Sequence, residues 1–210
     1  MKKNNLQKQL AKTTVVIPTL NEEEGIASVI KKTKAQGVKE IVILDGRSKD
    51  RTVQIAKKLG ARVITQKGKG KGNAFQTFLK KGLSTKTKYC VMIDADCSYD
   101  ANDIRRIVRA LSTRQVACGK RTTVRYNPRD FLHFLGNKGI SLIGFVLFGK
   151  LNPDICTGLW GFQTTALKKM EIKAQGFDLE ADLYAQTSKK NLSLALVPIK
   201  YHLRIGKGKL

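Results

Sequence analysis

Two aspartates one residue apart, Asp94 and Asp96, are the side chains around which this sequence is organised. They follow Tyr89 to Ile93, an apolar run that is typical of a buried strand. Ligands bind at the carboxyl ends of strands in open α/β sheets, where two such carboxylates can share a divalent cation with a diphosphate. A solvated loop is the alternative, because a D-x-D pattern alone is weak evidence. The next two acids, Asp100 and Asp103, are expected to begin a helix, whose N-terminus favours negative charge.

Alternating strands and helices are expected to hold this acidic loop in place. Apolar and β-branched runs predict the strands, and apolar residues at helical spacing predict the helices. Their order predicts an α/β fold with a mostly parallel central sheet, right-handed crossovers and flanking helices. Asn21 is expected to cap the first helix and Pro198 to end the last strand. The expected strands are 13–17, 38–44, 61–65, 89–93, 115–119 and 192–197, and the expected helices are 22–36, 52–59, 73–81, 104–111 and 177–190.

The chain is strongly basic. Its 210 residues carry 40 Lys and Arg against 16 Asp and Glu, a formal net charge of +24. This excess indicates an anionic partner, which is nucleic acid, an anionic membrane surface or a phosphorylated substrate, and charge alone does not choose among them. A hydrophobic content of 41% over this length suits one domain with a sizeable core, expected over residues 13–210.

The N-terminus and the cysteines bear on the cellular compartment. Residues 1–12 are basic and lack the apolar stretch of a signal peptide, so we expect a loose basic arm. The cysteines show neither the spacing of metal ligands nor the density of a secreted disulfide framework, which favours a reducing cytosol. They are Cys90, Cys97, Cys118 and Cys156.

Seven ordered blocks in this chain resemble those of a known family. The blocks are VVIPTLNEEE, ILDGRSKDRT, GKGKGNAF, MIDADCSY, TGLWGF, FDLEADL and YHLRIGKGKL. Together they resemble the family 2 glycosyltransferases, specifically the dolichyl-phosphate (polyprenyl-phosphate) hexose synthase branch, over roughly residues 13–210. The resemblance implies a GT-A fold, a nucleotide-diphosphate sugar donor, Mg²⁺ or Mn²⁺, inversion at the anomeric carbon and a lipid-phosphate acceptor.

The resemblance also implies which residues contact the donor. Asp96 matches the metal ligand of the family, with Asp94 in support near the nucleotide. Asp45 matches the first of two adjacent acids that most members have, whereas Gly46 stands in place of the second. Ser98 replaces a frequent Gln, so no metal role transfers to it. The implied donor-binding set is Pro18, Glu22, Asp45, Asp94, Ala95, Asp96, Arg121, Arg204 and Lys209.

Charged side chains are implied to act in catalysis. Arg121 and Arg204 would steady phosphate charge, and Glu180 would contact the sugar or the acceptor. The GKGKG loop lacks the G-K-[ST] ending of a Walker A motif, so nucleotide hydrolysis is not indicated. Its Lys69 and Lys71 face either the donor phosphates or the solvent. The implied catalytic set is Asp96, Arg121, Glu180 and Arg204.

The acceptor side is expected beyond the fifth strand. The resemblance places Asp154 and Trp160 beside the sugar, although packing in the core explains Trp160 better. Arg125 and Arg129 are candidates for holding the acceptor phosphate. Residues 131–151 are apolar, but their uncharged stretch is too short to span a bilayer. They form either a core helix or a helical hairpin in the membrane interface.

These inferences together predict an inverting transferase that moves a hexose or N-acetylhexosamine from a UDP- or GDP-sugar to a polyprenyl or dolichyl phosphate. We expect a peripheral protein at the cytoplasmic face of the cell membrane, alone or with an integral-membrane partner. Transfer to a soluble acceptor such as a phosphoglycerate is the alternative of the same fold. A nucleic-acid-binding protein is the remote alternative, and its affinity would fall steeply with salt. A lipid phosphate is already an anionic nucleophile, so no Ser–His or Cys–His pair is required.

Overall fold

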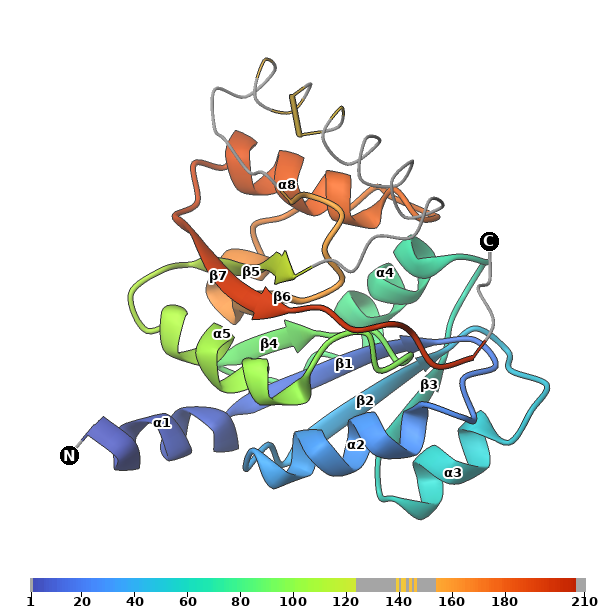
Figure 1. The fold of residues 1–210 in the computed structure, drawn as a ribbon. Coiled ribbons are helices and arrows are strands. Elements are labelled where there is room, and N and C mark those ends of the chain that lie inside the picture. Colours follow the sequence, from blue (N-terminus) through green and yellow to red (C-terminus); the bar gives the residue numbers. More distant parts are fainter. Residues whose placement is uncertain are drawn as a thin grey trace.

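A seven-stranded sheet is the centre of the fold, and its strand order is β3-β2-β1-β4-β6-β5-β7 (Figure 1). The computed structural model describes residues 2–123, 139, 141, 142, 144, 146 and 154–206. The strands are β1 (Thr13–Thr19), β2 (Glu40–Asp45), β3 (Arg62–Thr65), β4 (Tyr89–Met92), β5 (Val116–Thr123), β6 (Trp160–Gln163) and β7 (Leu194–Lys200). The helices are α1 (Lys2–Ala11), α2 (Ile26–Ala35), α3 (Thr52–Lys58), α4 (Lys71–Lys81), α5 (Ile104–Ala110), α7 (Thr164–Leu167) and α8 (Leu179–Lys189), with a 3₁₀ turn η1 (Ala101–Asp103).

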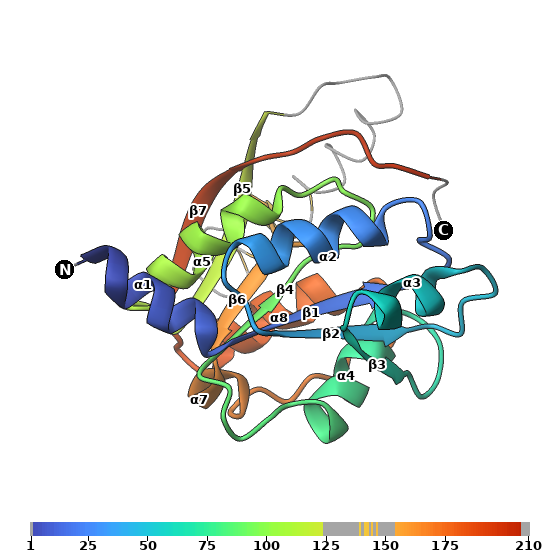
Figure 2. The ribbon, with the colours of Figure 1, turned by 90° about the horizontal axis from the view of Figure 1, so that it is seen from below.

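Helices cover both faces of the sheet and make two hydrophobic layers (Figures 1 and 2). Alternate residues of each strand point to opposite faces, so Val15 and Ile17 pack with α2 and α5 while Val16 packs with α4 and α8. Strand β6 alone runs antiparallel to its neighbours, β4 and β5. The expected α/β fold with a mostly parallel sheet is therefore confirmed.

The strand order reverses beside β1, which sets the position of the site. Strand β1 pairs in parallel with β2 on one side and with β4 on the other. The chain runs outward from β1 through β2 to β3 and then returns to place β4 across β1. Ligands of open α/β sheets bind in the crevice that such a reversal leaves at the strands' carboxyl ends. Residues that follow β1 and β4 must therefore line it.

Two expectations for the N-terminal half of the chain are wrong. Residues 1–12 were expected to be a loose arm, but α1 occupies Lys2–Ala11 and buries Leu6 and Leu10, which lie four residues apart on one helical face. Asn21 does not cap α2, because it has a positive φ of 50° and its Oδ1 accepts the Lys49 N–H at 2.7 Å. The helix begins later, at Ile26.

Of three expectations for the later elements, one is confirmed and two are wrong. Asp100 precedes η1 and accepts the Asn102 N–H at 3.0 Å, as expected of an acid at a helix start. Strand β5 continues through Arg121 to Thr123, beyond its expected end. Strand β7 continues past Pro198, because β7 is an edge strand and its proline needs no partner on the open side.

Candidate active site

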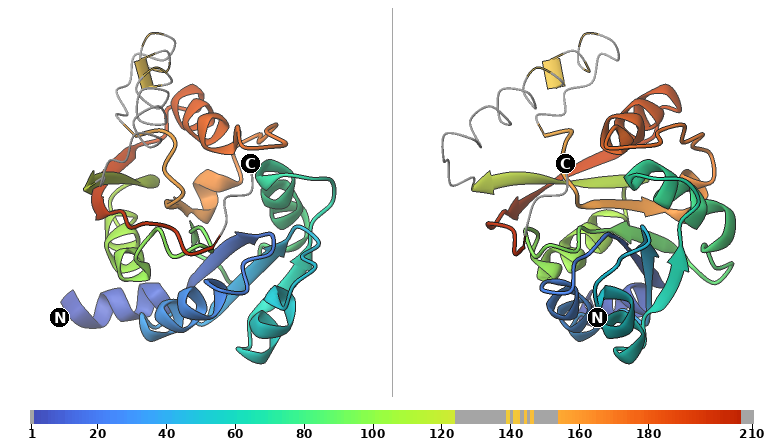
Figure 3. Two further views of the ribbon diagram at one scale, coloured as in Figure 1. Left: turned by 45° about the vertical axis from the view of Figure 1, so that its right-hand side comes forward. Right: turned by 90° about the vertical axis from the view of Figure 1, so that its right-hand side faces the viewer.

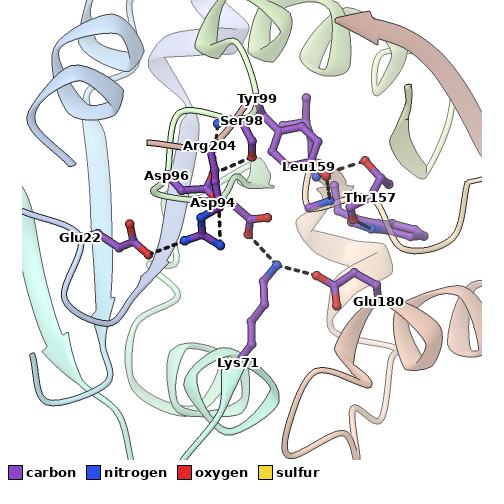
Figure 4. Close-up of polar contacts among 12 residues, drawn as sticks. Glu22, Lys71, Asp94, Asp96, Ser98, Tyr99, Thr157, Leu159, Glu180 and Arg204 are labelled. Atoms are coloured by element: carbon purple, nitrogen blue, oxygen red, sulfur yellow. Dashed lines mark hydrogen bonds and ion pairs between the residues drawn. The ribbon is translucent and has the colours of Figure 1, made fainter. Parts of the chain in front are cut away.

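The loop after β4 fixes the Asp96 carboxylate in one orientation (Figure 4). Ser98 donates its backbone N–H and its hydroxyl to Oδ1 of Asp96, at 3.0 and 2.5 Å. Oδ2 of Asp96 faces the guanidinium of Arg204 at 3.6 Å, and 15% of the Asp96 side chain is exposed. Ser98 thus orients Asp96, a role that the sequence did not indicate.

Lys71, at the start of α4, joins two acids from distant parts of the chain (Figure 4). Its Nζ lies 2.6 Å from Oδ1 of Asp94 and 2.5 Å from Oε1 of Glu180, in the first turn of α8. Exposure of the side chains is 12% for Lys71, 29% for Asp94 and 11% for Glu180. Lys71 therefore faces two carboxylates rather than the solvent.

Burial and neighbouring charges in this cluster shift the pKa values of Asp94 and Lys71. Burial raises the pKa of Asp94 to about 6, Glu180 and Asp96 add to the increase, and Lys71 opposes it. Burial lowers the pKa of Lys71, but Asp94 and Glu180 raise it by more, so its net shift is upward. Lys71 therefore stays protonated at neutral pH and partly balances two carboxylates.

A glycine allows the Asp94 carboxylate to sit where it does. A Cβ added to Gly158 would overlap Oδ2 of Asp94, so the carboxylate lies directly against the Gly158 backbone. The Gly158 N–H donates to Oη of Tyr99 at 2.6 Å, and Tyr99 is 5% exposed. The TGLWGF block therefore sets the position of Asp94, whereas the sequence indicated only an acceptor role for this block.

Residues 201–206, which we call the C-terminal strap, follow β7 and run back across the acidic loop (Figure 3). Backbone N–H groups of His202 and Ile205 donate to the carbonyls of Ser98 and Asp96, at 2.9 and 2.8 Å. Between them, Arg204 reaches Oε1 of Glu22 at 3.5 Å as well as Asp96. The strap thus brings Glu22, Asp96 and Arg204 together, three residues that the sequence had implicated in donor binding.

Arg121 and Asp154 are paired with each other. The Arg121 Nε and Nη2 donate to the Asp154 carboxylate, with the shortest distance 2.6 Å, and the Arg121 backbone N–H donates to it at 2.8 Å. The Arg121 guanidinium also lies over the Tyr201 ring, 5.1 Å from its centroid. Tyr201 meets Tyr99 edge to face at 5.3 Å. The structure therefore links Arg121 to the strap, and its phosphate contact stays a prediction.

The ends of β1 and β2 carry the other expected donor contacts. Asp45 is buried and accepts the backbone N–H groups of Arg47 and Ser48, each at 3.1 Å. The carboxylate thus shapes the loop after β2. Pro18 lies within β1, and Ala95 is buried between the two aspartates. Nucleoside binding by these residues stays a prediction.

Trp160 belongs to the core. Its side chain is 0% exposed, its Nε1–H donates to the Thr157 carbonyl at 2.8 Å and its ring stacks on Phe162. A fully buried ring offers no surface to an acceptor, so core packing is its role in this structure. Several expected residues lie outside the described part of the chain: Arg125, Arg129, Lys209 and most of residues 131–151, of which only 139, 141, 142, 144 and 146 are described.

The protein side chains fit a divalent cation that a ligand helps to hold. Among the described residues, no group of three or more His, Cys, Asp or Glu side chains could hold a metal ion. Asp96 supplies an oriented carboxylate at the rim, whereas Asp94 is paired with Lys71. Mg²⁺ sites of this kind combine one or two carboxylates with substrate phosphates. Asp96 is therefore the expected ligand, with Asp94 in support.

Comparisons with known proteins agree with this geometry. The family model described as Glycosyl transferase family 2 matches residues 14–171. The dolichyl-phosphate hexose transferase of Haloferax volcanii is 31% identical, over 93% of this chain and 85% of that protein. The UDP-N-acetylglucosamine–dolichyl-phosphate N-acetylglucosaminyltransferase of Methanococcus voltae is 28% identical, over 89% and 84%. Glycosyltransferase AglJ of Haloferax volcanii is 28% identical over 90% of this chain, which spans only 63% of AglJ.

A solved structure supports the fold independently. Glucosyl-3-phosphoglycerate synthase from Mycobacterium tuberculosis, in complex with phosphoglyceric acid, superposes with a TM-score of 0.78. The match covers 98% of this chain and 76% of that chain, at 23% sequence identity. The likeness confirms the expected GT-A fold.

Proposed function

We propose that this chain, which belongs to glycosyl transferase family 2, transfers a hexose or N-acetylhexosamine to a dolichyl or other polyprenyl phosphate. The donor is a UDP- or GDP-sugar, and transfer inverts the anomeric carbon. Two relatives support this acceptor, because their names describe transfer to dolichyl phosphate and this chain spans most of their length.

The observation that carries the proposal is the convergence of Asp96, Arg204 and the Lys71 cluster at the point where the strand order reverses. Asp96 and Arg204 provide a metal ligand and a cation at the diphosphate end of a donor. A divalent cation at Asp96 would neutralise charge that develops on the leaving diphosphate. Arg204 adds a guanidinium suited to phosphate oxygens.

Asp94, Lys71 and Glu180 form one cluster of charged side chains, which suits the sugar. Two carboxylates held by one ammonium offer oxygens that accept hydrogen bonds from sugar hydroxyls. Their mutual contacts fix their positions before the donor arrives, which reduces the reorganisation needed at the reacting carbon. The acceptor phosphate needs no general base, because it is anionic near neutral pH. The protein therefore mainly aligns the acceptor phosphate with the reacting carbon of the sugar.

Attachment to the cytoplasmic face of the membrane is part of the proposal, because the acceptor is a lipid. No helix among the described residues is both long and apolar enough to cross a bilayer. Leu142 and Val146, the described apolar side chains of 131–151, lie on a helix and are 63% and 75% exposed. Two exposed apolar residues one helical turn apart favour the interfacial alternative over a core helix.

A soluble acceptor is the second candidate. It is favoured by the likeness to the synthase whose complexes contain phosphoglyceric acid, UDP and Mn²⁺. That likeness, at 22 to 23% identity, extends to the fold alone.

Radiolabelled-sugar transfer tests the proposal. The protein is incubated with a panel of UDP- and GDP-sugars, Mn²⁺ or Mg²⁺ and dolichyl phosphate, and the organic phase is counted. Label is expected in the lipid for at least one donor, with EDTA and Asp96→Ala each abolishing it. The absence of a lipid product from every donor would refute the proposal, as would full activity of Asp96→Ala in EDTA.

A further inference from the structure

Arg204 occupies the position between two acids where a cation would be expected. Its guanidinium lies 3.5 Å from Glu22 and 3.6 Å from Asp96 (Figure 4). Glu22 follows β1 and Asp96 follows β4, the two strands that flank the reversal of strand order. The acids are 11% and 15% exposed, so each benefits from a nearby positive charge. Arg204 supplies that charge in this structure.

The strap can release the Arg204 side chain without leaving the site. Its backbone is tied to the acidic loop by His202 and Ile205, whose N–H groups make bonds of 2.9 and 2.8 Å. The contacts of the guanidinium are longer, and 37% of the Arg204 side chain is exposed. Long, partly solvated ion pairs are weak. Only the side chain therefore has to rotate for Arg204 to exchange partners.

Because the described part of the protein provides few ligands for a divalent cation, a bound nucleotide favours movement of Arg204 away from Asp96. The described residues provide no metal site of three or more side chains, so a cation at Asp96 depends on additional oxygens. A nucleoside diphosphate provides such oxygens, and its charge attracts the guanidinium away from Asp96. One nucleoside diphosphate can thus bind the divalent cation and the Arg204 guanidinium at the same time.

We infer that Arg204 is a built-in substitute for the divalent cation, so that the cation and the nucleoside diphosphate bind as a coupled pair. Without nucleotide, Arg204 neutralises Asp96 and Glu22 and opposes cation binding. With nucleotide, Arg204 moves to the diphosphate and Asp96 accepts the cation. The inference rests on the proposed function and deepens it, because it predicts how the two ligands depend on each other.

Direct titration of Mn²⁺ tests the exchange without any transfer reaction. Free Mn²⁺ is followed by electron paramagnetic resonance with the wild-type protein, Arg204→Gln and Arg204→Lys, each without nucleotide and with saturating UDP or GDP. Arg51→Gln is the matched control, because Arg51 pairs with Glu23 at 2.9 Å but is 75% exposed. Thermal unfolding of each variant verifies that it is folded.

Arg204→Gln is expected to bind Mn²⁺ about fivefold more tightly than the wild type without nucleotide, the upper range for a weak ion pair. The increase in Mn²⁺ affinity that nucleotide produces should be smaller in this variant than in the wild type, because no Arg204–Asp96 contact has to break, while the diphosphate oxygens still contribute. Arg204→Lys retains the charge and should resemble the wild type, as should Arg51→Gln.

Two outcomes overturn the inference and separate it from the proposed function. Equal Mn²⁺ affinity of Arg204→Gln and the wild type without nucleotide refutes the exchange, yet leaves the transferase proposal intact if nucleotide still promotes binding. Failure of every folded variant to bind Mn²⁺ with either UDP or GDP refutes both.

Discussion

At the scale of single residues, the site depends on one buried ammonium between two carboxylates. Lys71 lies within 2.6 Å of both Asp94 and Glu180, and no other Lys or Arg among the described residues forms an ion pair with either acid. Breaking such a pair leaves charge without compensation in a poorly solvated position. The identity of Lys71 therefore matters for stability as well as for ligand binding.

Lys71→Met is expected to lower the free energy of unfolding by about 1–3 kcal/mol, less than for a fully buried pair because Asp94 is 29% exposed. It should also weaken donor binding. Urea unfolding and calorimetry with UDP-sugars and GDP-sugars measure the two effects. Lys69→Met is the control, because Lys69 is exposed in the same loop. Equal stability of both variants would contradict the role given to Lys71.

The ionisation of Asp94 makes the free energy of unfolding depend on pH. Its pKa is raised from 3.8 to about 6, chiefly by burial, so the folded state holds this proton more tightly than the unfolded state. The contribution of Asp94 to the free energy of unfolding should therefore decrease as pH increases from about 4 to about 6. Carbon-13 NMR of the metal-free protein should show its carboxyl titrating near pH 6. Lys71→Met should raise that midpoint, and an unchanged midpoint near 4 in both proteins would contradict it.

Gly158→Ala tests the packing against Asp94. The added methyl would overlap the carboxylate, so donor binding is expected to weaken at least tenfold while the fold persists. Gly176→Ala is the control, since the nearest atom to its added Cβ is 3.6 Å away. Calorimetry with nucleotide sugars compares the two variants. Similar affinities would show that Asp94 does not need this position.

At the scale of elements, α1 is a basic segment that nevertheless packs against the rest of the fold. The segment is basic and was expected to be a loose arm, yet Leu10 is 0% exposed and α1 lies against α5. Leu10→Ala is expected to cost roughly 2–5 kcal/mol of unfolding free energy, as for other buried leucines. Urea unfolding measures it, with Lys8→Ala on the exposed face as the control. A loss below about 0.5 kcal/mol would mean that α1 is dispensable.

The sequence predicted most strands and helices because their apolar residues recur with clear periods. It did not predict β6, where the short WGFQ segment has only four residues and a central glycine. It did not predict the contacts of Lys71, which join residues 23 and 109 positions apart in the chain. The turn at Asn21 also depends on partners in the next loop. Contacts between distant segments leave no local pattern.

In the candidate site, too, the sequence identified individual residues but not the contacts between them. Asp94, Asp96, Glu180 and Arg204 were identified from motifs, and the structure brings them together in one place. Their pairing, and the roles of Ser98 and Gly158, depend on three-dimensional packing. The expectation that Trp160 packs in the core is confirmed, because its side chain is 0% exposed.

At the scale of the whole molecule, the net charge of +24 fits several anionic partners. The acids at the reversal of strand order narrow this choice of partner, because a basic protein that places acids at a ligand site is suited to a cation and phosphates together. Family membership identifies the reaction as glycosyl transfer.

A competition between two acceptors distinguishes transfer to a lipid phosphate from transfer to a soluble phosphate. The protein receives one radiolabelled nucleotide sugar, Mn²⁺, and equimolar dolichyl phosphate in vesicles and 3-phosphoglycerate in solution, and the label is partitioned between organic and aqueous phases. Asp96→Ala provides the background for both products. We expect label above that background in the organic phase, with the water-soluble product at background. Label that accumulates only as glycosylated phosphoglycerate would contradict it.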